Sequence, residues 1–101
     1  MESIQSKLTL LNDVTEDKKF LNSVIDKLLI LSREQYRNRL KRYDADLKIF
    51  ETRHGMSSDS FYKKFEAGQL GDEMDFFEWS GLIELRRDLL KKLKRFEQSD
   101  E

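Results

Sequence analysis

Side chains suited to catalysis or metal binding are few in this sequence. It contains one histidine, His54, and no cysteine, so the second His or Cys that usually completes a zinc site or a nucleophilic site is missing. His54 also falls at the end of a predicted helix, where the helix dipole favours a protonated imidazole. We therefore expect a helix-end or surface role for His54, no catalytic residue and no cofactor, and a protein that is not an enzyme.

A second candidate for chemistry is an acidic segment. Residues 65–85 hold six carboxylates and no lysine or arginine, and carboxylate oxygens are the ligands that Mg²⁺ and Ca²⁺ prefer. The stretch Gly71–Asp75, however, lacks the alternating oxygen ligands and the closing glutamate of an EF-hand loop. Helix capping and a solvated acidic face explain these side chains better, so no metal site is predicted.

The basic run Arg33–Arg42 is opposite in sign, with five basic side chains and one acid. It could contact phosphate groups, but it lies on a long amphipathic helix without a recognisable helix-turn-helix partner. The net charge of -1 gives no general attraction to nucleic acid or to an anionic membrane. A nucleic-acid-binding regulator, with Leu8–Leu10 as a pairing arm and Arg33–Arg42 on the phosphates, is kept as the alternative function.

The most distinctive segment is aromatic. Six of the eleven aromatic residues lie in positions 61–79, and the neighbours Phe76 and Phe77 differ by about 100° around a helix, so one narrow stripe cannot bury both. The segment is either a packed corner between helices or an acid-rimmed surface for a partner protein. Trp79 is expected at the edge of the core and Phe77 on the surface. The predicted partner-binding residues are Phe61, Tyr62, Phe65, Asp72, Asp75, Phe77, Glu78 and Trp79.

The elements that position these residues are predicted to be helices. The chain has 101 residues, no proline and four glycines, a composition that favours one all-α domain. Residues 1–13 form an arm of undecided structure, because strand-like alternation competes there with helical spacing. The single helical domain then covers residues 14–101. Its first helix is long and spans residues 16–53, with Asp13 or Thr15 as the N-cap.

Glycines and polar caps divide the rest of the chain. Gly55 should end the long helix, Ser57 or Ser58 should begin a short second helix, and Gly68 should end it. A third, long helix should begin at a capping Asp72 and fold back along the first. It would cover about 39 Å of a first helix that measures about 57 Å. The remainder should pair in an antiparallel homodimer. The predicted dimer interface is Leu21, Ile25, Leu28, Tyr36, Leu40 and Tyr43.

No membrane span or export signal is expected. The longest apolar run, Leu28–Leu31, is far shorter than the roughly 20 residues that a membrane-spanning helix needs. The N-terminus lacks the apolar core of a signal peptide, and the absence of cysteine suits a reducing compartment. We expect a cytoplasmic protein that does not associate with membranes.

The aromatic segment also carries a resemblance. A motif of short helical proteins from bacteria and archaea is similar to these features of the chain: His54-Gly55-Met56, Phe61-Tyr62, Phe65-Glu66, Gly68, Leu70-Gly71-Asp72 and Asp75-Phe76-Phe77-Glu78-Trp79. The resemblance covers roughly residues 36–96. That group resembles antitoxin-type or accessory proteins, often paired with a small toxin-like neighbour. It implies a non-enzymatic protein-protein interaction module whose partner is encoded by a neighbouring gene, and it brings no catalytic residues.

Overall fold

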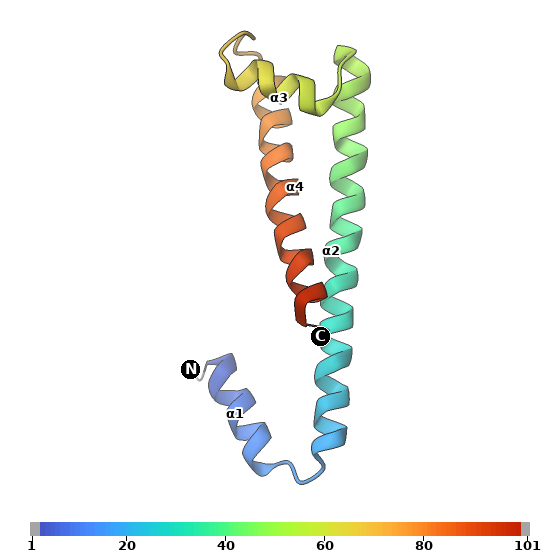
Figure 1. The fold of residues 1–101 in the computed structure, drawn as a ribbon, viewed down its shortest axis with the longest axis vertical. Helices are drawn as coiled ribbons and strands as arrows, with labels where there is room; N and C mark the ends of the chain where they lie inside the picture. The colour runs from blue at the N-terminus through green and yellow to red at the C-terminus, as the bar shows by residue number, and fades with distance from the viewer. Residues whose placement is uncertain (1–2, 100–101) are drawn as a thin grey trace. The chain divides into compact units, whose positions relative to one another are not determined.

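The computed structural model of the chain describes residues 3–99, which contain four helices and no strand (Figure 1). The helices are α1 (Ile4–Val14), α2 (Lys18–His54), α3 (Ser58–Glu66) and α4 (Met74–Ser99). The prediction of an all-α chain is confirmed. Among the described residues, no helix combines the length and the apolar character needed to cross a membrane. The chain divides into two compact units, Met1–Ser32 and Arg33–Glu101, with the boundary inside α2.

The first unit is a helical hairpin made of α1 and the first turns of α2. The Ser3 hydroxyl accepts the Ser6 N–H at 3.1 Å and caps α1. The arm that the sequence left undecided is therefore a helix, because the helical spacing of its apolar residues prevails over a short alternation; residues 1 and 2 lie outside the described range. The predicted cap at Asp13 or Thr15 is wrong. Asp17 caps α2 instead, with its carboxylate accepting the Phe20 N–H at 2.9 Å.

Two glycines end helices in the second unit, as predicted. Gly55 has a φ of 65°, and its N–H and that of Met56 donate to the Glu51 carbonyl at 2.9 and 3.3 Å. Gly68 has a φ of 70°, and there the Gly68 N–H donates to the Phe65 carbonyl at 3.1 Å and the Gln69 N–H to the Lys64 carbonyl at 3.0 Å. Only glycine adopts this left-handed conformation without strain, which explains why the helices end there.

The predicted start of α3 agrees with the structure, whereas the predicted start of α4 does not. The Ser57 hydroxyl accepts the Ser60 N–H at 3.1 Å, so Ser57 caps α3 as expected. α4 begins at Met74, two residues after the predicted cap Asp72. Its first turn is closed by the Phe76 N–H, which donates to the Glu73 carbonyl at 3.0 Å.

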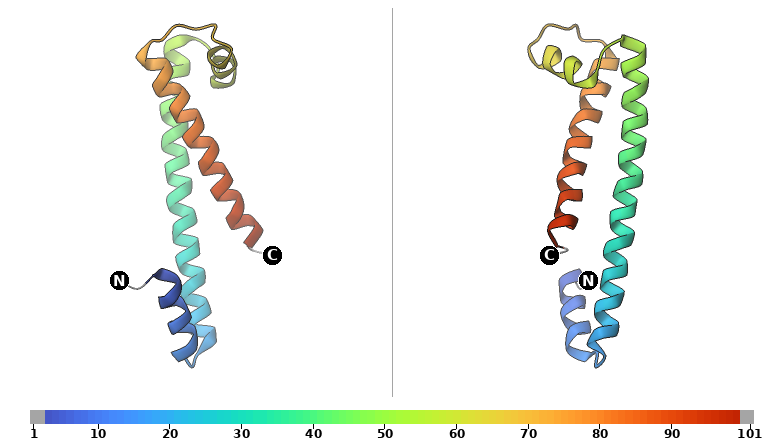
Figure 2. Two further views of the ribbon diagram at one scale, coloured as in Figure 1. Left: turned by 90° about the vertical axis from the view of Figure 1, so that its left-hand side faces the viewer. Right: turned by 45° about the vertical axis from the view of Figure 1, so that its right-hand side comes forward.

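Within the second unit, α4 lies antiparallel to α2, and α3 packs against α4 near the end of α2 (Figure 2). The pairing follows from contacts in which the residue numbers rise along α2 and fall along α4. Going along α2, the contacts are Tyr36 with Phe96, Asp44 with Arg86, Phe50 with Trp79 and Arg53 with Asp75. The core of this unit is a cluster of five buried side chains, namely Leu47, Phe50, Phe61, Phe76 and Trp79.

Candidate functional site

The aromatic segment is built around Trp79. Its ring has no exposed surface and stacks on Phe61 with ring centroids 3.9 Å apart and an interplanar angle of 3°. The indole N–H donates to the Ser58 hydroxyl at 2.9 Å, which satisfies the one polar group of the ring. Trp79 therefore lies at the centre of the core. The sequence-based expectation that it lies at the edge of the core is wrong. Phe61 has no exposed surface either.

His54 and Asp75 connect the end of α2 to the first turn of α4. His54 Nε2 lies 3.0 Å from Asp75 Oδ2, and Arg53 Nη1 donates to the same oxygen at 2.7 Å. Hydrogen bonds from Arg53 and then His54 lower the pKa of the Asp75 carboxyl below its ordinary value. The His54 ring also stacks on Trp79 at 5.5 Å. This arrangement is typical of a structural clamp, and His54 occupies the helix end that its position predicted.

The other predicted partner-binding residues differ in exposure. Tyr62 is half-buried, and its hydroxyl donates to Glu84 Oε1 at 3.1 Å; desolvation, together with this bond, raises the pKa of the Tyr62 hydroxyl. Phe65 is half-buried, and its ring lies at right angles to that of Phe77 with ring centroids 5.7 Å apart. Phe77 is 54% exposed, as expected. Asp72 and Glu78 are also exposed.

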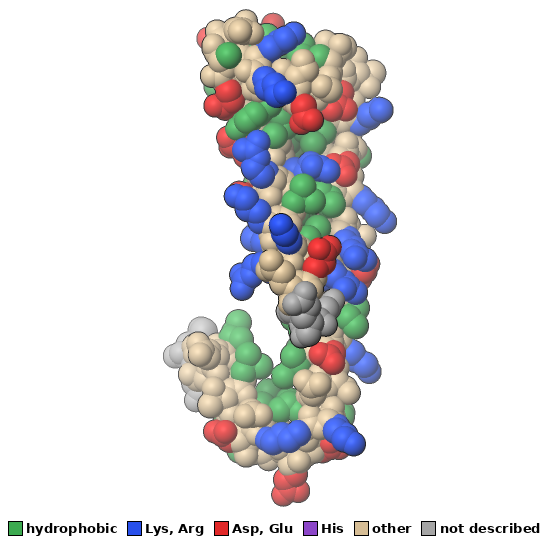
Figure 3. Space-filling model, viewed as in Figure 1, with side chains coloured by type: hydrophobic (Ala, Val, Ile, Leu, Met, Phe, Trp, Pro, Cys, Tyr) green, Lys and Arg blue, Asp and Glu red, His purple; other side chains and the backbone are tan. Residues whose placement is uncertain are grey.

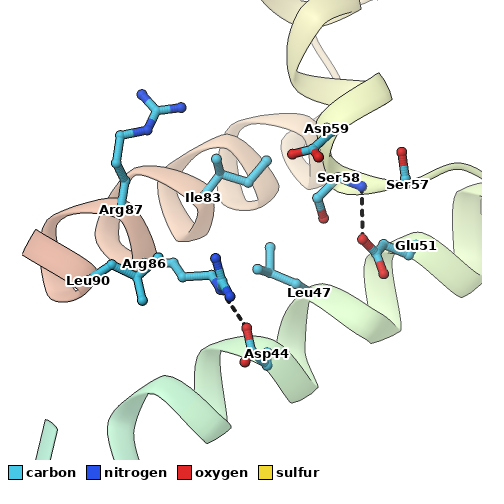
Figure 4. A pocket seen from close by; sticks show the side chains of 10 residues that line it. All are labelled: Asp44, Leu47, Glu51, Ser57, Ser58, Asp59, Ile83, Arg86, Arg87 and Leu90. Atoms are coloured by element: carbon cyan, nitrogen blue, oxygen red, sulfur yellow. Dashed lines mark hydrogen bonds and ion pairs between the residues drawn. The ribbon is translucent and has the colours of Figure 1, made fainter. Parts of the chain in front are cut away.

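A polar cleft of about 480 Å³ opens between α2, α3 and α4 (Figure 4). Two of its acids are engaged within the chain. Arg86 Nε donates to Asp44 Oδ1 at 2.6 Å, and Glu51 Oε2 accepts the Ser58 N–H at 2.8 Å. The cleft is lined by no histidine, and in residues 3–99 no group of three or more metal-binding side chains gathers. The two serine hydroxyls of the cleft also accept hydrogen bonds within the chain, Ser57 from the Ser60 N–H at 3.1 Å and Ser58 from the Trp79 indole N–H at 2.9 Å.

An apolar groove of about 510 Å³ lies between α2 and α4. The sequence prediction missed it. The one available signal was Gly81, a glycine in the middle of a predicted helix that is otherwise rich in apolar residues. The groove is lined by Asp46, Ile49, Phe50, Glu78, Gly81, Leu82 and Leu85.

The hairpin of residues 3–32 exposes most of its apolar side chains. No residue in it is buried, and hydrophobic side chains gather on the sides where its two helices face each other (Figure 3). A shallow space of about 550 Å³ is lined by Leu21 and Ile25, two members of the predicted dimer interface. The large exposed apolar residues are Ile4, Leu8, Leu10, Leu11, Val14, Phe20, Val24, Leu28, Leu29, Ile30 and Leu31.

The rest of the predicted dimer interface is divided between the two units. Leu28 is 56% exposed in the hairpin. Tyr36, Leu40 and Tyr43 are half-buried in the second unit. There the Tyr36 ring packs against Phe96 of α4, with ring centroids 5.7 Å apart. The chain itself thus covers part of that stripe and leaves the hairpin part open.

The basic run has partners within its own unit. Arg37 Nη1 lies 3.5 Å from Glu34 Oε1. The Arg39 guanidinium and the Lys92 ammonium lie 5.7 and 5.9 Å from the centroid of the Tyr36 ring. Within the basic run, Arg37 therefore has an ion-pair partner and Arg39 a cation–π contact.

Comparison with known proteins finds no matching family model, no matching curated protein and no matching solved structure.

Proposed function

We propose that this chain is a non-enzymatic protein-protein interaction module that forms a homodimer through the hairpin of residues 3–32. One observation carries the proposal: the hairpin has eleven large apolar side chains on its surface and none buried. Burying one such side chain contributes about 1.5–3 kcal/mol. Covering eleven that are already partly buried would contribute on the order of 10 kcal/mol per chain.

The run Leu28–Leu31 shows why α1 alone is an insufficient cover. Successive residues of a helix point about 100° apart, so these four side chains point to all sides of α2. Each of them is 45–60% exposed. A helix that is apolar all round is stable in water only when it is surrounded, and α1 can cover only one side. A second hairpin would provide neighbours for the others, as in a four-helix bundle.

The charges of the hairpin are compatible with a second copy as the cover. Residues 3–32 contain four lysines and four acids, so two hairpins have no net charge with which to repel each other. Half of these charged residues lie in positions 16–19, at the turn between the helices. The helical flanks therefore carry only four charged residues, which is compatible with a closed two-fold association.

The second part of the proposal concerns a partner protein. Exposed aromatic and acidic side chains on the second unit, Phe77 and Glu78 among them, suit an antitoxin-like or accessory role in which the dimer captures the product of a neighbouring gene. Aromatic anchors with a polar rim are typical of such interfaces.

Light scattering on a sizing column tests the dimer. The native chain should elute as a dimer at micromolar concentration, and the variant Leu28→Gln/Leu31→Gln should be monomeric. These side chains are 56% and 60% exposed, and glutamine is a good helix former, so the hairpin itself should remain folded. The matched control is Ile49→Gln/Leu85→Gln, with side chains 54% and 51% exposed in the second unit. It should remain a dimer. A native chain that is monomeric at tens of micromolar would refute the proposal.

A further inference from the structure

We propose that the apolar groove between α2 and α4 is a docking site for a basic amphipathic helix of a partner protein. This inference rests on the proposed function, because it specifies where and what an interaction module binds. It concerns the second unit alone and is independent of the hairpin.

The groove has the form of a helix-binding site. Phe50, which is 8% exposed, and the half-buried Leu82 lie at its base. Ile49 and Leu85 flank it and are 54% and 51% exposed. The α4 residues that line it run from Glu78 to Leu85, about two helical turns, or roughly 11 Å. A docked helix places apolar side chains at positions i, i+3 or i+4, and i+7, which matches this length.

The structure of the second unit does not itself require a glycine at position 81. It lies within α4, where glycine is about 1 kcal/mol less favourable than alanine. A Cβ atom built on Gly81 would meet no atom within 4 Å, and φ is not positive. The second unit therefore does not require glycine for space or for conformation. Close approach of another backbone does require it, since any side chain at this position would project into the groove.

The charge of the groove selects a basic occupant. Asp46 on α2 and Glu78 on α4 line it, both are exposed, and neither forms an ion pair with another described residue. Asp44 and Asp75, by contrast, are already paired with arginines of the chain. Lysine or arginine side chains flanking the apolar stripe of a docked helix would meet both carboxylates of the groove.

A second copy of this chain is a poor occupant. Its basic helical segments are residues 33–42 and 86–95, and their apolar sides pack within the second unit, where Tyr36 meets Phe96 and Leu89 is buried. α1 is apolar and exposed but carries one basic residue, Lys7. The helix that fits the groove therefore belongs to a different protein.

Two fluorescent peptides of about four helical turns provide the probe, one made of leucine and lysine and the other of leucine and glutamate. Fluorescence anisotropy with the full chain should show binding of the lysine peptide, roughly tenfold tighter than that of the glutamate peptide. The variant Gly81→Leu should weaken binding of the lysine peptide roughly tenfold. Its unfolding temperature should not fall, because leucine is a better helix former than glycine.

The contribution of charge is tested with the variant Asp46→Asn/Glu78→Gln. This variant should bind the lysine peptide several-fold more weakly, and its binding should depend less on salt concentration. The matched control, Glu66→Gln/Glu73→Gln, removes two exposed carboxylates outside the groove and should change nothing. Absence of binding, equal binding of the two peptides, or insensitivity to Gly81→Leu would overturn the proposal. So would a change of oligomeric state in Gly81→Leu, which would identify a second copy as the occupant. The dimer measurement is separate, so either proposal can fail alone.

Discussion

Replacing Trp79 by alanine should remove the centre of the second unit. The ring has no exposed surface, stacks on Phe61 at 3.9 Å and lies 5.8 Å from Phe50. Truncation of a buried tryptophan costs about 3–5 kcal/mol. For a chain of this size the unfolding temperature should fall by at least about 12 °C. The variant Trp79→Phe keeps a ring but removes the donor to the Ser58 hydroxyl, and it should cost about 1–2 kcal/mol.

The comparison with Phe77→Ala makes this prediction specific. Phe77 is 54% exposed, and among the described residues its ring packs at right angles to that of Phe65, with ring centroids 5.7 Å apart. Its truncation should cost about 1 kcal/mol or less and should chiefly weaken partner capture. Urea unfolding followed by circular dichroism at 222 nm is the assay, because Trp79 is the single tryptophan and its fluorescence disappears with it. Equal destabilisation by Phe77→Ala and Trp79→Ala would show that both residues only pack the corner, and the assignment of Phe77 to an interface would fail.

Two further predictions concern charge. Because Arg53 and His54 lower the pKa of Asp75, folding favours its charged form; the resulting stability is complete above the unfolded pKa of about 3.9 and is lost as the pH falls through the lowered folded value. Urea titrations between pH 2 and 5 should show that the free energy of unfolding depends less on pH in Asp75→Asn than in the native chain. The same pH dependence in both would contradict a stabilising role of the contacts between Asp75, Arg53 and His54. Binding to random duplex DNA should be weak at physiological salt; strong, salt-steep binding that disappears in Arg37→Glu/Arg39→Glu/Arg42→Glu would instead support the nucleic-acid alternative.

Sequence patterns located the helix ends marked by glycine better than those marked by polar caps. Gly55 and Gly68 are unambiguous because the left-handed conformation has few other occupants. Around residues 13–17 several side chains could cap a helix, and the choice of Asp17 depends on where α1 ends. The same ambiguity placed the start of α4 at Asp72, two residues before the observed Met74.

For the candidate site, spacing on one helix distinguished Phe77 from Trp79 but could not show how deeply either lies. The complete burial of Trp79 depends on Phe61 of α3 and on Phe50 of α2, and contacts between helices are not visible in the periodicity of one of them. The groove was missed for the same reason, since its walls come from two helices that are far apart in sequence. Gly81 indicates the groove only when the structure shows that no atom lies within 4 Å of a Cβ built at this position.

Amide hydrogen exchange of the native chain at several protein concentrations tests most directly whether the hairpin is the surface that joins two copies. Dimerisation through residues 3–32 predicts that protection of these amides increases as the concentration rises through the dimer dissociation constant. Protection of the core around Trp79 should not change with concentration. Rapid exchange of residues 3–32 at every concentration, in a chain whose core around Trp79 is protected, would contradict the account.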